Sequence, residues 1–492
     1  MSDPDLVIGL DSSTQSTKAI AWTREGEPVA EGRAPIPMAT PRPGWAEQDP
    51  GDWWSAATTA LTALCAQVDP ARVAGLAVSN QRETVALVDA GLAPTRPAMV
   101  WLDERARSEL KPFSDAFGAE ALHRLTGKPV DVTPVVYRLS WLRRHEPETL
   151  DRAAQILDVH GYLTGRLTGR ATASWTSADP FGVFDIAEKA WSAPILDRLG
   201  LGADRFAALA PPGARIGAVT EAGAAETGLR PGTPVFAAGG DGQCAGLGVD
   251  AARPGVVYLN LGTAIITGAW SADPRPRLSW RTMTSPTGEG YFLEGCQRAG
   301  AFFVNWFVDT LAGGRDQPDV FARLEAEAAS LPVGSEGVTV SPYLSGCMDP
   351  HWDPDARAAF LGLAPHHGLG HLYRASLEAL TLESARCVAA MDAAGMGPER
   401  IVAVGGGAAS ALWRGMIADA TGLPLSVSRS VEASSLGAAM AAAAGLGWHA
   451  SLPEAAAAMS AQGDATVPDP ARAKEWRALA DRQARAYRAG GL

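Results

Sequence analysis

The sequence is poor in cysteine, and its cysteines show no pairing pattern. Five occur among 492 residues, and none stands in a C-x-x-C motif: Cys65, Cys244, Cys296, Cys347 and Cys387. Disulfide frameworks and structural zinc sites need thiols at regular spacings, so we expect reduced thiols in a cytoplasmic protein. The opening residues MSDPDLV lack the basic region and apolar run of a signal peptide, and we expect none.

An excess of positive charge and a long apolar run are missing too. The chain has 54 acidic and 42 basic residues and a net charge of −12, which argues against nucleic acid or an anionic membrane as a partner. The most apolar late stretch, SLGAAMAAAAGLGWHA (435–450), is too short to span a bilayer and predicts a tightly packed core helix. A small anionic ligand remains compatible with this charge.

The common nucleotide and metal fingerprints are absent. No G-x-x-x-x-G-K-[ST] or G-x-G-x-x-G occurs, which excludes a Walker-type NTPase and speaks against a nicotinamide-dependent dehydrogenase. H-E-x-x-H is absent as well. His366, His367 and His371 follow Pro365, so we expect them at a helix start and not around a metal ion.

The sequence contains the same pattern twice. DLVIGLDSSTQSTKAIAWT (5–23) and GVVYLNLGTAIITGAW (255–270) both run from an apolar strand through a small polar turn to a second strand. A chain of 492 residues is too long for one core. We therefore expect two related α/β domains, 1–249 and 250–492, joined by a linker at VDAARPG (249–255).

Both polar turns carry groups that bind phosphate. In the first, a strand ends at Asp11 and is followed by Ser, Thr and a Lys; such a turn offers amides, hydroxyls and an ammonium to phosphate, and a carboxylate to Mg²⁺. In the second, Gly262 allows close approach and Thr263 supplies an N–H and a hydroxyl. An ordinary capped hairpin is the alternative at either place.

Two glycine-rich strand ends are further candidates. GGGA (405–408) joins a strand to a helix expected near Ser410, a place where anions and nucleotides bind; a tight strand–helix turn is the alternative. Asp241 has Gly240 and Gly242 on either side. A ligand can therefore come close, and its carboxylate can accept a proton from a hydroxyl, although a helix N-cap would also favour Asp there.

Polar groups that can read hydroxyls follow two other strands. Gln81, Arg82 and Glu83 end one apolar run, and Trp101 and Asp103 end the next. Arg donates in a fixed fork and Glu accepts, while a Trp face suits the C–H side of a polyol. A solvated Arg–Glu hairpin and a core Trp are the alternatives.

Several motifs follow one another along the chain in this order: GLDSSTQSTK, GWAEQDPGDWW, VSNQRET, WLDERAR, GGDGQCAGLG, LNLGTA, PYLSG with PHWDPDARAAFLGL, and GGGAASALWR. Together they resemble the FGGY carbohydrate kinase family. The resemblance covers roughly residues 5–450. It implies an α/β fold of two ribonuclease H-like domains of the actin/hexokinase superfold, with mixed sheets around a central cleft. It also implies ATP and Mg²⁺ as cofactors and a small sugar or polyol as substrate, and it allows a homodimer.

The resemblance also assigns roles to residues. Asp241 matches the catalytic base and, with Asp11, a Mg²⁺ ligand. Phosphate and adenosine would be bound by Asp11, Thr14, Lys18, Gly262, Thr263, Gly405, Gly406, Gly407 and Ala408. The sugar or polyol would contact Gln81, Arg82, Glu83, Trp101, Asp103 and Asp241.

The motifs point to more than one substrate. NQRET resembles glycerol kinases, but Gly242 and Thr133 replace the Gln and Tyr expected there, and PYLSG and PHWDPDARAAFLGL resemble xylulose kinases. We expect D-xylulose or another pentulose first and glycerol second, with Gly242, Thr133 and Thr233 leaving room for the longer chain. A sugar- and ATP-binding sensor without catalysis is a remote alternative.

Overall fold

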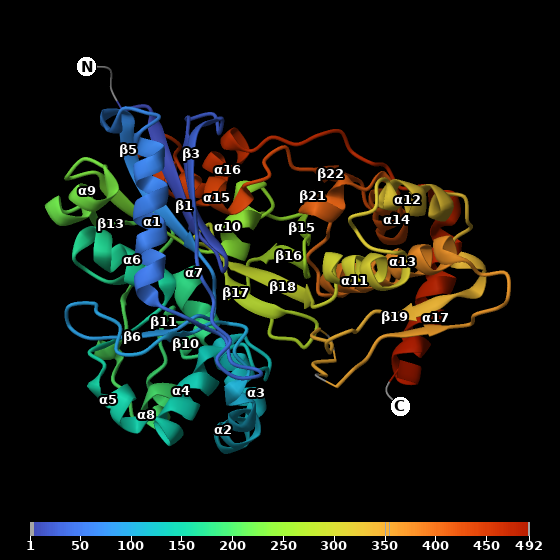
Figure 1. The fold of residues 1–492 in the computed structure, drawn as a ribbon, viewed down its shortest axis with the longest axis horizontal. Coiled ribbons are helices and arrows are strands. Elements are labelled where there is room, and N and C mark those ends of the chain that lie inside the picture. Colours follow the sequence, from blue (N-terminus) through green and yellow to red (C-terminus); the bar gives the residue numbers. More distant parts are fainter. Residues whose placement is uncertain (1–3, 350, 354, 491–492) are drawn as a thin grey trace.

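A computed structural model describes residues 4–349, 351–353 and 355–490. Two six-stranded mixed sheets form the centres of two halves, which lie at the left and right of Figure 1. A lobe of short helices lies below the first sheet in that view. No helix in the described part of the chain combines the length and apolarity needed to cross a membrane.

The first sheet has the order β13-β14-β5-β1-β2-β3, in which β1, β5 and β14 run parallel and the other neighbours antiparallel. β1 is buried along its whole length, as its apolar run predicts. Helices α1 (Pro50–Cys65) and α6 (Val159–Thr168) pack on one face. The strands are β1 (Leu6–Ser12), β2 (Ser16–Trp22), β3 (Pro28–Pro35), β5 (Val73–Asn80), β13 (Arg215–Ala218) and β14 (Pro234–Gly240).

The second sheet, in the order β17-β18-β16-β15-β21-β22, repeats this topology. β15 pairs antiparallel with β16 and parallel with β21, as β1 does with β2 and β5, so the repeat seen in the sequence is a repeat of the fold. The strands are β15 (Val256–Leu261), β16 (Ile265–Ser271), β17 (Arg281–Thr284), β18 (Tyr291–Gln297), β21 (Arg400–Val404) and β22 (Leu425–Val427). Its core helices are α11 (Ala301–Leu311), α12 (Val320–Ala329), α13 (Leu369–Ala393), α14 (Ala411–Thr421) and α17 (Ala473–Gly490).

The lobe has its own apolar core and is attached to both halves. Its helices include α2 (Leu110–Phe117), α3 (Ala119–Thr126), α4 (Val135–His145), α5 (Pro147–Arg152) and α8 (Ala193–Leu199), beside the paired strands β6 (Ala86–Val88) and β8 (Gln155–Leu157). The buried Lys128 ammonium donates to the Thr282 carbonyl of β17 (2.8 Å). The buried Asp179 carboxylate accepts from the Thr284 hydroxyl (2.6 Å). Buried polar contacts thus join the lobe to the second sheet.

Two late helices cross over to the first sheet. α15 (Ala433–Gly445) and α16 (Leu452–Met459) belong by sequence to the predicted second domain, yet α15 packs against β1, β5 and β14 of the first, and α16 packs on α15 and α10 (Figure 1). The approach is close: a Cβ at Gly9 would stand 1.9 Å from the Ser435 carbonyl oxygen. The small residues of α15 make this contact with the sheet feasible. The domain boundary at 249/250 stays a prediction.

The expected linker is packed and not loose. Val249 and Ala251 are fully buried, in a small core shared with the start of α15. Asp250 has a left-handed backbone (φ +56°) and pairs with Arg253 (2.7 Å). The halves are therefore joined by an ordered crossing.

Candidate functional site

Asp241 is placed by the end of β14. The strand ends at Gly240 and helix α10 (Asp241–Gly248) begins at once. The Asp241 side chain is 35% exposed, and its Oδ1 lies 3.2 Å from the Arg82 Nε. The carboxylate is thus both accessible and held by a cation.

Asp11 lies near Asp241. Its Oδ1 accepts from the Ser79 hydroxyl (2.9 Å), and burial followed by the charge of Asp241 raises the pKa of Asp11 to about 6. Burial also raises the pKa of Asp241, against the effect of Arg82. Two carboxylates that disfavour each other's ionisation suit a divalent cation, which prefers oxygen ligands and relieves the repulsion. The donor set therefore fits Mg²⁺.

The first polar turn contacts the predicted sugar residues. The Trp101 indole N–H donates to the Thr14 hydroxyl (2.9 Å), so one predicted phosphate residue and one predicted sugar residue are in direct contact. The Lys18 ammonium, however, forms an ion pair with Glu432 (2.7 Å), just before α15. A phosphate group would have to share Lys18 with that carboxylate.

The second polar turn and the GGGA motif are also in contact. Gly405 has a left-handed φ of +86°, and a Cβ there would lie 2.6 Å from Asn260 Oδ1, next to Gly262. Gly406 faces open space, and Ser410 caps α14 as expected. Ala408 is buried as a whole residue. Its N–H donates to the Gly405 carbonyl (3.0 Å), and its carbonyl accepts from Arg414 (2.6 Å), so its role toward a ligand stays a prediction.

Thr263 is the exposed residue of the second turn. Its carbonyl accepts from Gly300 N (3.0 Å) and Phe302 N (3.1 Å), so backbone bonds fix the turn and the side chain remains accessible. This is the arrangement that a phosphate-binding hydroxyl requires.

Arg82 and Glu83 are bound by the second half, which sequence reasoning missed. The buried Glu294 of β18 accepts from Arg82 Nη1 (2.9 Å) and Nη2 (3.1 Å). Arg281 of β17 donates to Glu83 (2.8 Å) and to Glu294. Burial opposes ionisation of Glu294, but Arg82 and Arg281 outweigh it and lower the pKa of Glu294 to about 2. These four charges, with Asp241 as a fifth, form one chain of ion pairs between the halves.

Arg138 is a second residue that the sequence did not reveal. It is fully buried and donates to the backbone carbonyls of Val100 (2.5 Å), Glu83 (2.6 Å) and Thr133. Because Glu83 has a left-handed backbone (φ +49°), the bond to its carbonyl helps to hold an unfavourable conformation. Arg138 thereby ties three loops of the predicted sugar site together.

Gln81 and Asp103 are engaged within the protein. Gln81 donates to Gln48 (2.9 Å) and accepts from Thr84 (3.1 Å). Asp103 accepts from Ala46 N (2.8 Å) and from Arg105 Nε (2.8 Å) and Nη2 (2.6 Å). Both are buried. Their role toward a sugar stays a prediction.

The room expected beside Asp241 is partly filled. A Cβ at Gly242 would lie 2.9 Å from Arg82 Nη2 and 3.0 Å from Glu294 Oε2, so this glycine makes space for the ion pair and not for substrate. Thr233 precedes β14 while Asp241 follows it, which separates them by roughly 25 Å of strand. The expectation that Gly242 and Thr233 leave room for substrate is therefore wrong. The Thr133 hydroxyl donates to Asp131 (2.6 Å), and the expectation that Thr133 leaves room for substrate stays a prediction.

The three histidines cluster with Glu336 at the start of α13. Glu336, His366 and His367 lie close enough to share a metal ion. However, His367 Nδ1 accepts from Ala364 N (2.9 Å) and His371 Nδ1 from Gly368 N (3.1 Å). A neutral imidazole that accepts at Nδ1 carries its proton at Nε2, so neither ring can offer Nε2 to a metal without losing its bond.

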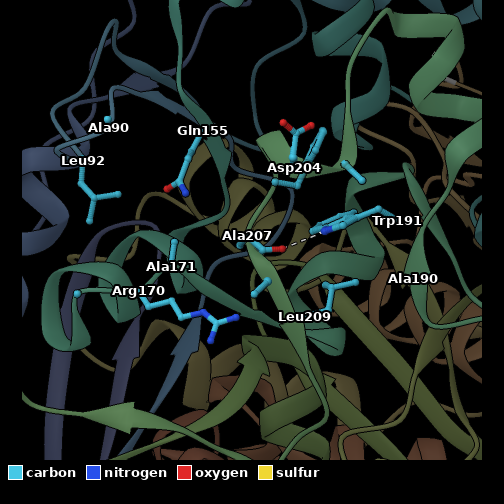
Figure 2. A pocket seen from close by; sticks show the side chains of 14 residues that line it. Ala90, Leu92, Gln155, Arg170, Ala171, Ala190, Trp191, Asp204, Ala207 and Leu209 are labelled. Carbon is cyan, nitrogen blue, oxygen red and sulfur yellow. Dashed lines mark hydrogen bonds between the residues drawn. The ribbon is translucent and has the colours of Figure 1, made fainter.

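A separate hollow of about 680 Å³ lies between the lobe and the first half (Figure 2). Apolar residues line most of it, and the Trp191 indole N–H already donates to the Ala207 carbonyl (3.0 Å). None of the predicted site residues contributes to its lining. The hollow is therefore separate from the predicted site.

Residues 6–248 match the N-terminal domain of the FGGY family of carbohydrate kinases, and residues 257–446 match its C-terminal domain. The chain belongs to the FGGY family of carbohydrate kinases. It is thus an ATP-dependent carbohydrate kinase, as the ordered motifs indicate. The matched residues include both polar turns, the GGGA motif and Asp241.

FGGY kinases of different substrates resemble the chain. It is 31% identical to a xylulose kinase of Klebsiella pneumoniae over 85% of this chain and 86% of that one. It is 32% identical to a glycerol kinase of Aromatoleum aromaticum (strain DSM 19018 / LMG 30748 / EbN1) over 92% of each. The crystal structure of xylulose kinase from Rhodospirillum rubrum superposes with a TM-score of 0.93 and 31% identity over 98% of both chains, which confirms the predicted fold class.

Proposed function

We propose that this kinase transfers a phosphoryl group from ATP to a hydroxyl of a pentulose, with D-xylulose the first candidate. The observation that carries the proposal is the accessible Asp241 carboxylate, held by Arg82 and close to Asp11 of the first phosphate turn. The xylulose kinases among its relatives support the choice of sugar.

In the proposed reaction, Asp241 orients the acceptor hydroxyl and takes its proton late in the transfer. Thr263 and the backbone of the two polar turns bind the phosphates, and Gly405 to Gly407 lie where adenosine would bind. Mg²⁺ held by Asp11 and Asp241 would neutralise charge on the transferred group. Arg82 contributes by fixing Asp241, because Glu294, Gln243 and Asp241 already take most of its donors.

Glycerol is the second candidate, on the NQRET motif and the glycerol kinase relative. The contacts of Arg82 and Glu83 weaken it. Both are paired with Glu294 and Arg281, so the NQRET motif does not by itself single out glycerol. The homodimer and the cytoplasmic location stay predictions.

One panel of acceptors tests the substrate. We expect a higher kcat/KM for D-xylulose or a similar pentulose or pentitol than for glycerol, measured by coupled ADP release. The panel contains glycerol, tetritols, pentitols, pentuloses, hexuloses and gluconate. Glycerol at the top by tenfold or more would replace the pentulose in this proposal.

Thr263→Val tests the nucleotide site. The change removes one exposed hydroxyl and keeps the side-chain shape, so we expect the Michaelis constant for ATP to rise by about tenfold or more, since a hydrogen bond to a charged group contributes about 1.5–3 kcal/mol. The Michaelis constant for the sugar should stay near wild type. Unchanged kinetics toward ATP would contradict this role for Thr263.

A further inference from the structure

Arg298 lies at the end of β18 and points its charge toward the lobe. Its Nη2 is 3.7 Å from Asp131 Oδ1, and its Nη1 is 3.8 Å from Glu104 Oε1. Both distances exceed those of a hydrogen bond. Within the described residues, no hydrogen bond of the Arg298 guanidinium is found. In the Arg82–Glu294 pair, by contrast, the guanidinium donates two hydrogen bonds to the carboxylate. The donors of Arg298 therefore remain available for a ligand.

The two carboxylates each keep one oxygen free for this site. Asp131 Oδ2 accepts from the Thr133 hydroxyl (2.6 Å), and Glu104 Oε2 accepts from Arg107 (2.8 Å). The other oxygen of each faces Arg298. The side chains of Arg298, Asp131 and Glu104 are 23%, 16% and 38% exposed, so a ligand can reach them.

Arg298, Asp131 and Glu104 are linked to the proposed reaction site, Arg298 through the second half of the molecule and the two carboxylates through the lobe. Two residues after Arg298, Gly300 N donates to Thr263 in the second phosphate turn (3.0 Å). On the lobe, Arg138 binds the carbonyls of both Thr133 and Glu83. Glu104 follows Trp101, whose indole contacts the first phosphate turn. The three charged groups are thus joined to the loops that carry the predicted phosphate and sugar residues.

We propose that Arg298, Asp131 and Glu104 form a subsite that reads the hydroxyls of the acceptor farthest from Asp241. A hydroxyl can donate to a carboxylate oxygen and accept from a guanidinium at once. A carboxylate ligand has no proton to donate and would face two like charges. The subsite therefore selects neutral polyols longer than glycerol and disfavours sugar acids. This inference rests on the proposed function.

Arg298→Gln tests the subsite. We expect kcat/KM for D-xylulose to fall by about tenfold or more, mainly because the Michaelis constant for D-xylulose rises. The kcat/KM for glycerol should change less than twofold, and the Michaelis constant for ATP should be unchanged. The readout is the ratio of kcat/KM for each longer polyol to that for glycerol. Arg315→Gln, an exposed arginine paired with Asp309, is the matched control.

Neutralising the two carboxylates of the subsite gives a second test. Asp131→Asn combined with Glu104→Gln should raise kcat/KM for gluconate relative to D-xylulose by about tenfold, because the repulsion is removed. Equal losses on glycerol and D-xylulose in Arg298→Gln would overturn the subsite, since they would indicate a role toward phosphate. Unchanged ratios in both variants would also overturn it. The rank of wild-type substrates tests the proposed function separately, because the subsite is judged only by the change in ratio.

Discussion

Replacing Asp241 with Asn is expected to lower the turnover number for sugar phosphorylation by about 10²–10⁴-fold, the range for a positioned acid–base group. Asn has the same shape but cannot accept the proton of the acceptor hydroxyl. The proposed adenosine site, at Gly405 to Gly407, follows β21 of the other sheet. Binding of ADP without metal, measured by calorimetry, should therefore stay near wild type.

The matched control for this variant is Asp115→Asn. Asp115 lies on α2 with its side chain largely exposed and paired with Lys111, and its replacement should leave turnover within twofold of wild type. If Asp241→Asn retains more than half of the wild-type turnover, Asp241 is not the base.

Glu294→Gln is expected to lower the free energy of unfolding by about 3–5 kcal/mol, the cost of removing one member of a buried ion pair. The variant leaves Arg82 and Arg281 buried without their shared carboxylate. Urea denaturation followed by tryptophan fluorescence measures the change. Arg82 also holds Asp241, so turnover should fall as well.

Glu120→Gln provides the comparison for Glu294→Gln. Glu120 is exposed and pairs with Arg124 one helical turn away, and such surface pairs contribute about 0–1 kcal/mol. A loss for Glu294→Gln no larger than that of Glu120→Gln would mean that the ion-pair chain does not join the halves energetically.

The parts of the site that the sequence predicted are those set by local chain geometry. Asp241, Thr263 and Gly405 each stand where an apolar strand ends in small or polar residues, and this pattern is visible over about ten residues. The repeat of strand, turn and strand likewise predicted two related sheets. Each of these features depends only on neighbours in the sequence.

The parts that were missed depend on distant neighbours. Glu294 stands inside the buried strand YFLEGCQ, where an acidic residue signals a buried partner, but that partner, Arg82, is 212 positions away. Arg138 is one of three arginines in VVYRLSWLRRH, and nothing local separates it from Arg143 and Arg144. The same holds for Gly242, whose small size serves an ion pair that no single stretch contains.

The crossing of α15 onto the first sheet means that the repeating unit of the sequence is not a unit that could stand alone. A chain cut after residue 249 would leave Val7, Ile20 and Ala77 uncovered on one face of its sheet. The two repeats are related as the partners of a swapped dimer that have been joined into one polypeptide. A rearrangement of the halves would therefore have to keep α15 on the first sheet, so that the halves could turn about this contact without separating.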